Sequence, residues 1–174
     1  MRKVSNDPTE GEKGAGADGW HIDGYYLEYP FLCNVLHPVE VSKGGETWIS
    51  PMKELVESLE PEVLELWDKL YFMTGNMKGK EFFHPFICKH PITGDRSMVF
   101  HLGEGKCWGL IELKEILKGR LRRRFIHIDK MFEIIKDLSE RLHDPERKLR
   151  MDWEKGDIGF IDNRAVCHLA SPAS

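Results

Sequence analysis

The sequence lacks a long uninterrupted apolar run, and no stretch approaches the roughly 18 apolar residues that a membrane-spanning helix needs. It also lacks the apolar core of a signal peptide, because Met1-Arg2-Lys3-Val4 leads into polar and turn-forming residues. These two absences predict a soluble, cytoplasmic protein that does not bind membranes.

Neither a CxxC pair nor a large excess of charge is present. The 4 cysteines are scattered, which argues against a structural zinc site and a disulfide scaffold, so we expect reduced thiols. The 25 Lys and Arg residues nearly balance the 29 Asp and Glu residues, for a net charge of -4. Nothing global therefore attracts nucleic acid, and a small-molecule partner is favoured. A homo-oligomer remains open.

The composition is that of an ordinary globular chain. Its 174 residues are 41% hydrophobic and 10% aromatic, which is enough for one domain with a hydrophobic core. Residues 1–19 have hardly any apolar side chains, so we expect a flexible lead-in there. Residues 20–174 are then expected to form the folded domain.

Periodicity and turn residues predict a mixture of short strands and helices. The first helix is expected to begin at Pro51, with Ser50 as its N-cap. A second helix is expected to begin at Pro61 and a third at about Asp129. One strand is predicted at 34–41. A hairpin is predicted from strands at 86–88 and 98–100 with a turn at 93–95. Near the end of the chain, strands are predicted at 158–161 and 165–169 with a turn at 162–164 between them.

Two side chains that commonly bind metals occur two residues apart in Trp20-His21-Ile22-Asp23. In an extended segment such residues project from the same face, so His21 and Asp23 can share one ion. His168, on the last predicted strand, completes a set of two histidines and one carboxylate. Such a set leaves positions open on iron(II) for a co-substrate and dioxygen, whereas structural zinc is usually closed by four protein ligands.

A second His-x-Asp sequence, His127-Ile128-Asp129, has a structural interpretation. It directly precedes the apolar stripe of the third helix, where Asp129 is well placed to cap the first turn. We therefore prefer His21 and Asp23 as the metal ligands. The other histidines are interpreted as surface or scaffold residues: His37, His84, His90, His101 and His143.

Several motifs resemble those of the taurine dioxygenase family, which includes phenoxyacetate and carnitine-pathway oxygenases. The matching segments, in chain order, are Trp20-His21-Ile22-Asp23, Gly44-Gly45-Glu46-Thr47-Trp48, His84-Pro85, His90-Pro91-Ile92-Thr93-Gly94, Trp153 with Gly156-Asp157, and Asp162-Asn163-Arg164 with His168. Together they run over almost the whole chain.

The resemblance implies a mainly β fold with flanking helices, the double-stranded β-helix, which is a cupin-like jelly-roll barrel. It implies an Fe(II)- and 2-oxoglutarate-dependent dioxygenase that uses O2 to hydroxylate a small organic substrate, releasing succinate and CO2. In that family the threonine at the place of Thr47 contacts 2-oxoglutarate. Three aromatic residues follow the metal motif closely and suit either the pocket or the core: Tyr25, Tyr26 and Phe31.

One family residue has no counterpart here. Family members carry an arginine some ten or more residues beyond the last histidine, and it grips the far carboxylate of 2-oxoglutarate. The sequence ends at Ser174, six residues after His168, and begins only twenty residues before His21. We therefore expect an incomplete catalytic domain, truncated at both ends. Arg164 is the nearest arginine, although the resemblance implies a structural role for it.

Two alternatives follow from these observations. The first is a catalytically weak or inactive metal-binding remnant of the family, because the arginine is absent. The second is a zinc-dependent hydrolase or a cupin-like binding protein that uses the same ligands.

The basic run at 120–124 has no interleaved aromatic residues, so we interpret it as a solvated loop and not as a nucleic-acid site.

Overall fold

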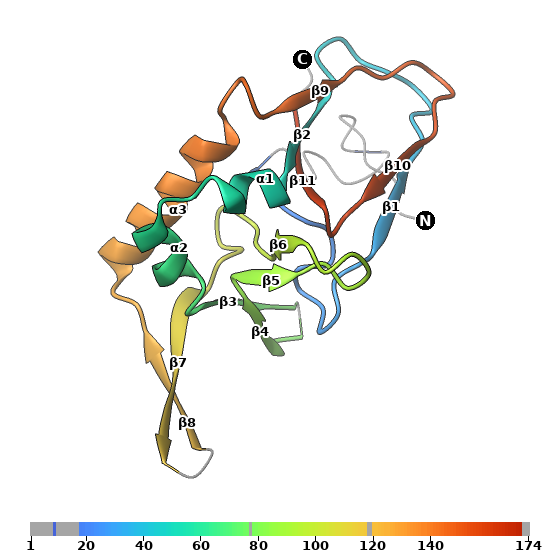
Figure 1. Ribbon diagram of the computed structural model, residues 1–174. Coiled ribbons are helices and arrows are strands. Elements are labelled where there is room, and N and C mark those ends of the chain that lie inside the picture. The colour runs from blue at the N-terminus through green and yellow to red at the C-terminus, as the bar shows by residue number, and fades with distance from the viewer. Residues whose placement is uncertain (1–8, 10–17, 77, 118–119, 172–174) are drawn as a thin grey trace.

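The structure is a computed structural model that describes Thr9 and residues 18–76, 78–117 and 120–171. Within these residues the chain is built mainly from short strands, with three helices (Figure 1). The expected lead-in at 1–19 lies outside the described residues except for Thr9, Asp18 and Gly19. No helix of the described part is of a length and hydrophobicity that would cross a lipid bilayer.

The described strands form four separate antiparallel sheets and no closed barrel. The sheets are β1 (Cys33–Leu36) with β10 (Gly159–Asp162); β11 (Val166–Ala170), β2 (Thr47–Pro51) and β9 (Leu149–Met151); β4 (Glu81–Pro85), β3 (Leu70–Gly75), β7 (Gly109–Leu117) and β8 (Arg120–Phe125); and β5 (Ile87–Lys89) with β6 (Arg96–Met98). In two of these sheets, strands from the first third of the sequence pair with strands near its end. The fold therefore depends on contacts between distant segments.

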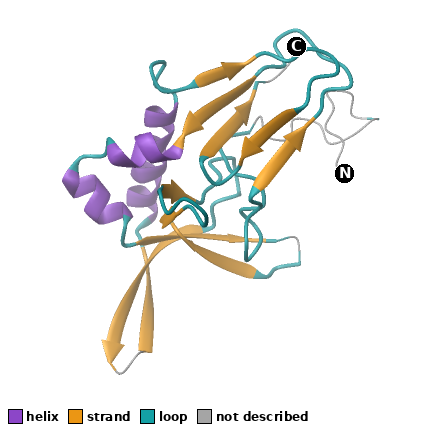
Figure 2. Cartoon of the chain, turned by 45° about the vertical axis from the view of Figure 1, so that its right-hand side comes forward, coloured by secondary structure: helices purple, strands orange, loops and turns teal. Residues whose placement is uncertain are grey.

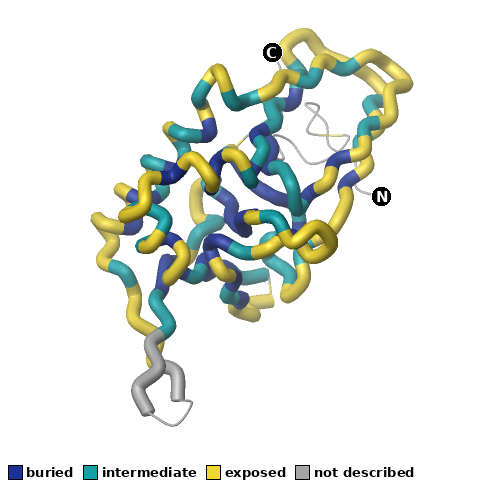
Figure 3. The backbone as a smooth tube through the Cα atoms, in the orientation of Figure 1, coloured by how far each residue is buried: buried dark blue, intermediate teal, exposed yellow. Residues whose placement is uncertain are grey.

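The helices are α1 (Met52–Glu57), α2 (Pro61–Trp67) and α3 (Ile128–Leu142), and they lie together on one side of the molecule (Figure 2). Helix α3 is amphipathic, and its buried face carries Met131, Ile134, Leu138 and Leu142. That face packs into the hydrophobic core, which also contains the largest fully buried side chains. Figure 3 shows these buried segments in the interior, between the helices and the strands.

The helix starts were predicted with mixed success. Pro61 is the first residue of α2, as predicted. The prediction for α1 was wrong, because β2 continues through Ser50 and Pro51 and the helix begins at Met52. Pairing of β2 with β11 extends the backbone at Ser50, so its hydroxyl makes no cap. At α3 the cap is His127, whose ring nitrogen accepts from the backbone N–H of Asp129, and not Asp129 itself.

The predicted strands near the chain end and the hairpin are confirmed with small shifts in their bounds. Strands β5 and β6 pair as a hairpin, and β10 and β11 follow each other around the turn at 163–165. The predicted strand at 34–41 is shorter, because β1 ends at Leu36, before His37 and Pro38. The prediction of a solvated loop at 120–124 was wrong. These residues belong to β8, which pairs with β7 in a hairpin that extends from the body (Figure 1).

All four cysteines are free thiols in the structure. Cys167, on β11, is fully buried, and burial raises the pKa of its thiol. Cys33, by contrast, is exposed on β1.

Candidate metal centre

The segment that carries His21 and Asp23 is inserted between two longer segments of the chain. His21 forms antiparallel bridges with both His101 and His168. On one side, Leu102 N donates to Trp20 O at 2.9 Å, and on the other, His21 and His168 exchange two backbone hydrogen bonds. The segment therefore behaves as a very short central strand, and its neighbours determine its position.

Alternation along this short strand separates core residues from polar residues. Trp20 and Ile22 are almost completely buried and belong to the hydrophobic core. His21 and Asp23 therefore project from the opposite face, as the spacing predicted. The large apolar side chains anchor the backbone, and the two polar side chains are presented together.

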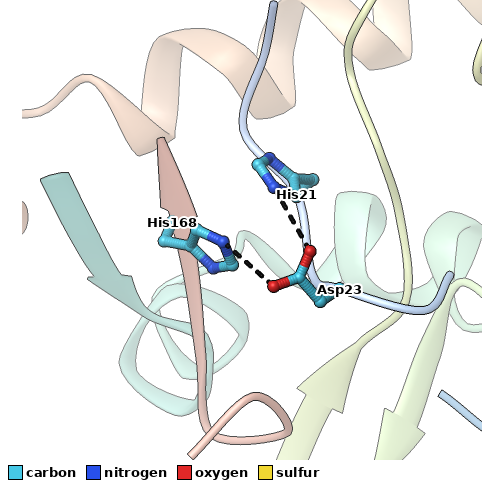
Figure 4. Close-up of side chains that lie close together, drawn as sticks. All are labelled: His21, Asp23 and His168. Atoms are coloured by element: carbon cyan, nitrogen blue, oxygen red, sulfur yellow. Dashed lines mark ion pairs between the residues drawn. The ribbon is translucent and has the colours of Figure 1, made fainter. Parts of the chain in front are cut away.

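His168 completes the cluster. One potential ligand atom from each of His21, Asp23 and His168 lies within 4.8 Å of the others, and this is the only such group found among the described residues. Figure 4 shows the two imidazoles facing the carboxylate, with His21 Nε2 3.9 Å from Asp23 Oδ1 and His168 Nε2 3.6 Å from Asp23 Oδ2. The structure thus brings together the three residues that the sequence analysis selected.

The hydrogen bonds of the histidines leave suitable lone pairs on them. His21 Nδ1 lies 2.8 Å from the carbonyl oxygen of Gly19. A carbonyl only accepts, so Nδ1 carries the proton and Nε2 has the free lone pair. Burial, and to a smaller extent repulsion from His21 when that ring is protonated, lowers the pKa of His168 to about 3. His168 is therefore neutral at physiological pH, which is the form that binds metals.

Asn163, which the sequence analysis quoted only as part of a motif, holds the backbone of Asp23 in place. Asn163 is completely buried, and its Oδ1 accepts from the backbone N–H of Asp23 at 2.8 Å. Its Nδ2 donates to the Asp23 carbonyl at 2.9 Å and to the Phe31 carbonyl at 2.8 Å. The backbone of Asp23 is therefore clamped from both sides by Asn163, a role that no local pattern reveals.

His101 lies beside the cluster. Its ring stacks on that of His21, with ring centroids 4.6 Å apart and planes inclined by 18°. Its Nδ1 accepts from the backbone N–H of Gly103 at 2.9 Å, and burial lowers its pKa to about 2. Tyr25 packs edge-on against the same ring, with centroids 4.6 Å apart. His101 is thus a neutral, aromatic support for His21.

Thr47, the residue expected to contact 2-oxoglutarate, is on the strand next to His168. In the register of β2 and β11, Thr47 faces Ala170 and Ile49 faces His168. Residues directly opposite each other in an antiparallel pair share a face, so Thr47 and His168 lie on the same side of this sheet. The Thr47 hydroxyl accepts from Trp153 Nε1 at 3.0 Å and keeps its own proton available for donation.

Arg164 lies in the turn between β10 and β11, within the predicted turn at 162–164. Its guanidinium donates to Cys88 Sγ at 3.6 Å, and its carbonyl accepts from the Ser97 hydroxyl at 2.5 Å. These contacts connect the turn to the β5–β6 hairpin. They agree with a structural role and give no support to Arg164 as a co-substrate anchor.

The second His-x-Asp sequence is separate from the cluster. The side chains of His127 and Asp129 are 76% and 82% exposed, and they lie at the start of α3. Three other histidines bond to scaffold groups: His37 to Asp157, His90 to Asp162 and His143 to Ser139. Their interpretation as scaffold residues agrees with these contacts.

Comparison with known proteins identifies the relatives of this chain. The family model described as "Taurine catabolism dioxygenase TauD, TfdA family" matches residues 2–174. An alkylsulfatase of Acinetobacter baylyi is 25% identical over an alignment of 195 positions, which covers 92% of this chain and 54% of that protein. An alpha-ketoglutarate-dependent sulfate ester dioxygenase of Pseudomonas putida is 26% identical over an alignment of 187 positions, which covers 92% of this chain and 56% of that protein.

A solved structure agrees with these matches. A taurine dioxygenase from Burkholderia xenovorans superimposes with a TM-score of 0.70 at 25% identity, covering 88% of this chain and 51% of that chain. The chain thus spans about half the length of the relatives that it matches. Because the family model covers nearly every residue, the chain belongs to the TauD, TfdA family of taurine catabolism dioxygenases.

Proposed function

We propose that this chain carries the iron(II) centre of an alpha-ketoglutarate-dependent dioxygenase, with His21, Asp23 and His168 as the metal ligands. The observation that supports this proposal most directly is the convergence of these three side chains within 4.8 Å. They come from the two ends of the described chain, so local sequence cannot account for their meeting. Two imidazoles and one carboxylate are a ligand set typical of non-haem iron(II) oxygenases.

The donor set fits iron(II) better than a closed zinc site. Three protein ligands leave coordination positions for a bidentate co-substrate and for dioxygen, whereas structural zinc sites usually have four protein ligands. His21 binds through Nε2 because its Nδ1 is committed to the Gly19 carbonyl. Bound iron(II) would activate O2, the oxidant, for hydroxylation of a small organic substrate, and conversion of 2-oxoglutarate to succinate and CO2 would supply the other two electrons that reduction of O2 needs.

The protein's contribution is to orient these partners. Thr47 lies on the face of the β2–β11 pair that also carries His168, so its hydroxyl is suited to donate to a carboxylate of 2-oxoglutarate. Asn163 prevents the Asp23 backbone from shifting. His101 covers one face of the His21 ring, and Tyr25 packs against His101 in turn, which limits access of water to that side of the ligand.

We further propose that residues 20–174 are one portion of a double-stranded β-helix catalytic domain. Antiparallel pairing of β1 with β10 and of β2 with β11, which joins early strands to late ones, supports this assignment. The chain spans only about half the length of its relatives. The remaining strands of such a barrel would then correspond to the part of the relatives that this chain does not match.

Anaerobic titration tests the proposed function. Iron(II) is added to the metal-free chain, and 2-oxoglutarate is then added while visible absorption is recorded. We expect a charge-transfer band when both are present, and succinate formation once oxygen and ascorbate are supplied. Iron binding and the band without succinate would instead identify a metal-binding form that does not turn over. Failure of iron(II) to bind, or iron(II) binding without a band after 2-oxoglutarate is added, would contradict the proposal.

A further inference from the structure

The carboxylate of Asp23 receives a hydrogen bond from a residue that none of the family motifs includes. Asn34 lies in the middle of β1 and is buried. Its Nδ2 donates to Asp23 Oδ2 at 2.7 Å and to Asn163 Oδ1 at 3.0 Å. A buried asparagine side chain on an otherwise apolar strand therefore contacts a proposed metal ligand directly.

The surrounding hydrogen bonds determine which way the Asn34 amide points. Asn163 Nδ2 faces two backbone carbonyl oxygens, of Asp23 and Phe31, which can only accept. Asn163 Oδ1 must therefore be the atom that faces Asn34, and only the NH2 group of Asn34 can donate to it. The same NH2 group then has a hydrogen left for Asp23 Oδ2. The network is consistent in this single arrangement.

This arrangement gives the two carboxylate oxygens of Asp23 different surroundings. Oδ2 accepts from Asn34 and lies 3.6 Å from His168 Nε2, while Oδ1 lies 3.9 Å from His21 Nε2. The donated hydrogen bond opposes rotation of the carboxylate about its Cβ–Cγ bond. It also withdraws charge from one oxygen, so the two oxygens are no longer equivalent as ligands.

We propose that Asn34 is a positioning residue that orients the Asp23 carboxylate for the metal. The inference rests on the proposed iron function and adds to it a residue that lies outside the ligand set. Hydrogen bonds to ligating side chains typically contribute 10–100-fold to metal affinity, so loss of this bond should be measurable by binding alone. Asn34 also couples the β1–β10 pair to the centre, because Asn163 follows β10 directly.

The test compares Asn34→Leu with Asn76→Leu in the full chain. Leucine has nearly the shape of asparagine but no donor. Asn76 is a matched control outside the centre, where its side chain accepts from the backbone N–H groups of Lys78 and Lys80. Cobalt(II) is the probe, because its visible spectrum reports the geometry of its ligands without any turnover. Urea unfolding of each metal-free variant measures the general loss of stability.

We expect Asn34→Leu to bind cobalt(II) about 10–100-fold more weakly than the wild type and to show a changed visible spectrum at saturation. Asn76→Leu should lose stability while it retains wild-type affinity and spectrum. If Asn34→Leu does not fold, Asn34→Ala removes the same donor with less bulk and carries the same expectation. Wild-type affinity and spectrum in a folded Asn34 variant would overturn the inference and leave the proposed function intact. Absence of cobalt and iron binding by the wild type would overturn both.

Discussion

His21 and His168 exchange two main-chain hydrogen bonds, from His21 N to His168 O at 3.0 Å and from His168 N to His21 O at 2.9 Å. The pair therefore sits directly opposite in an antiparallel bridge, and their ring centroids are 4.3 Å apart. Because backbone hydrogen bonds determine this spacing, the pairing itself brings the two imidazoles together. The centre is largely preorganised by the pairing of distant segments.

Removal of a ligand should abolish metal binding. His21→Ala and Asp23→Ala each delete one of three proposed ligands, so we expect iron(II) affinity to fall by more than about 100-fold, beyond the usual effect of a supporting residue. Calorimetric titration of the metal-free protein measures the affinity. The variants His127→Ala and Asp129→Ala change the other His-x-Asp sequence, which is exposed at the start of α3, and should bind iron(II) normally. An equal loss of iron(II) affinity in the His127 and Asp129 variants would refute the assignment of His21 and Asp23 as the metal ligands.

Acid should destabilise the metal-free protein at a pH where carboxylates remain charged. Burial lowers the pKa of His168 to about 3 and that of His101 to about 2, whereas histidines in the unfolded chain have the ordinary pKa of about 6.5. Below pH 6.5 the unfolded state thus binds more protons, and stability falls as pH decreases. Each histidine contributes a slope approaching about 1.4 kcal/mol per pH unit.

Urea unfolding with chelator between pH 7.5 and pH 5 measures this slope. His101→Phe retains an aromatic ring against His21 but removes one titrating group. The slope of the free energy of unfolding against pH should therefore decrease by the contribution of one histidine. A variant with the same slope as the wild type would show that His101 does not remain neutral in the folded protein.

Loss of the Thr47 hydroxyl should weaken 2-oxoglutarate binding. Thr47→Val has the same shape but cannot donate, and a hydrogen bond to a charged group contributes about 1.5–3 kcal/mol, or roughly 10–100-fold in affinity. The charge-transfer titration measures this affinity. Trp153→Phe removes the other partner of the Thr47 hydroxyl while it leaves that hydroxyl in place, so 2-oxoglutarate affinity should be retained. A similar loss in both variants would indicate that Thr47 acts only through packing.

A methyl group at Gly19 should disturb the centre through the backbone. A Cβ atom there would lie 2.5 Å from Gly103 N, a backbone atom that cannot move alone. Gly19 also accepts the hydrogen bond that fixes the His21 tautomer. We expect Gly19→Ala to lower both the free energy of unfolding and the affinity for cobalt(II). Gly79→Ala is the matched control, because Gly79 has a φ of +76° but open space around its Cβ, so it should affect stability alone.

Some features of the fold could be predicted because they are local. Pro61 begins a helix since its ring suits the first turn, and the turn around Gly94 produces the β5–β6 hairpin. The strand at 120–124 was missed because its arginines show no apolar alternation. It forms through pairing with β7, and Glu112 of that strand lies 3.6 Å from Arg124. The start of α1 was misplaced because pairing with β11 keeps Ser50 extended.

The sequence alone determined which side chains are available for chemistry and that His21 and Asp23 project from one face, because side-chain direction alternates along any extended segment. Only the tertiary structure decided that His168 meets them, that His101 stacks on His21 and that Asn34 donates to Asp23. These relationships depend on the register between strands that are far apart in the chain. Register is set by the burial of whole strand faces and by long-range backbone hydrogen bonds, and neither can be derived from the local pattern of residues.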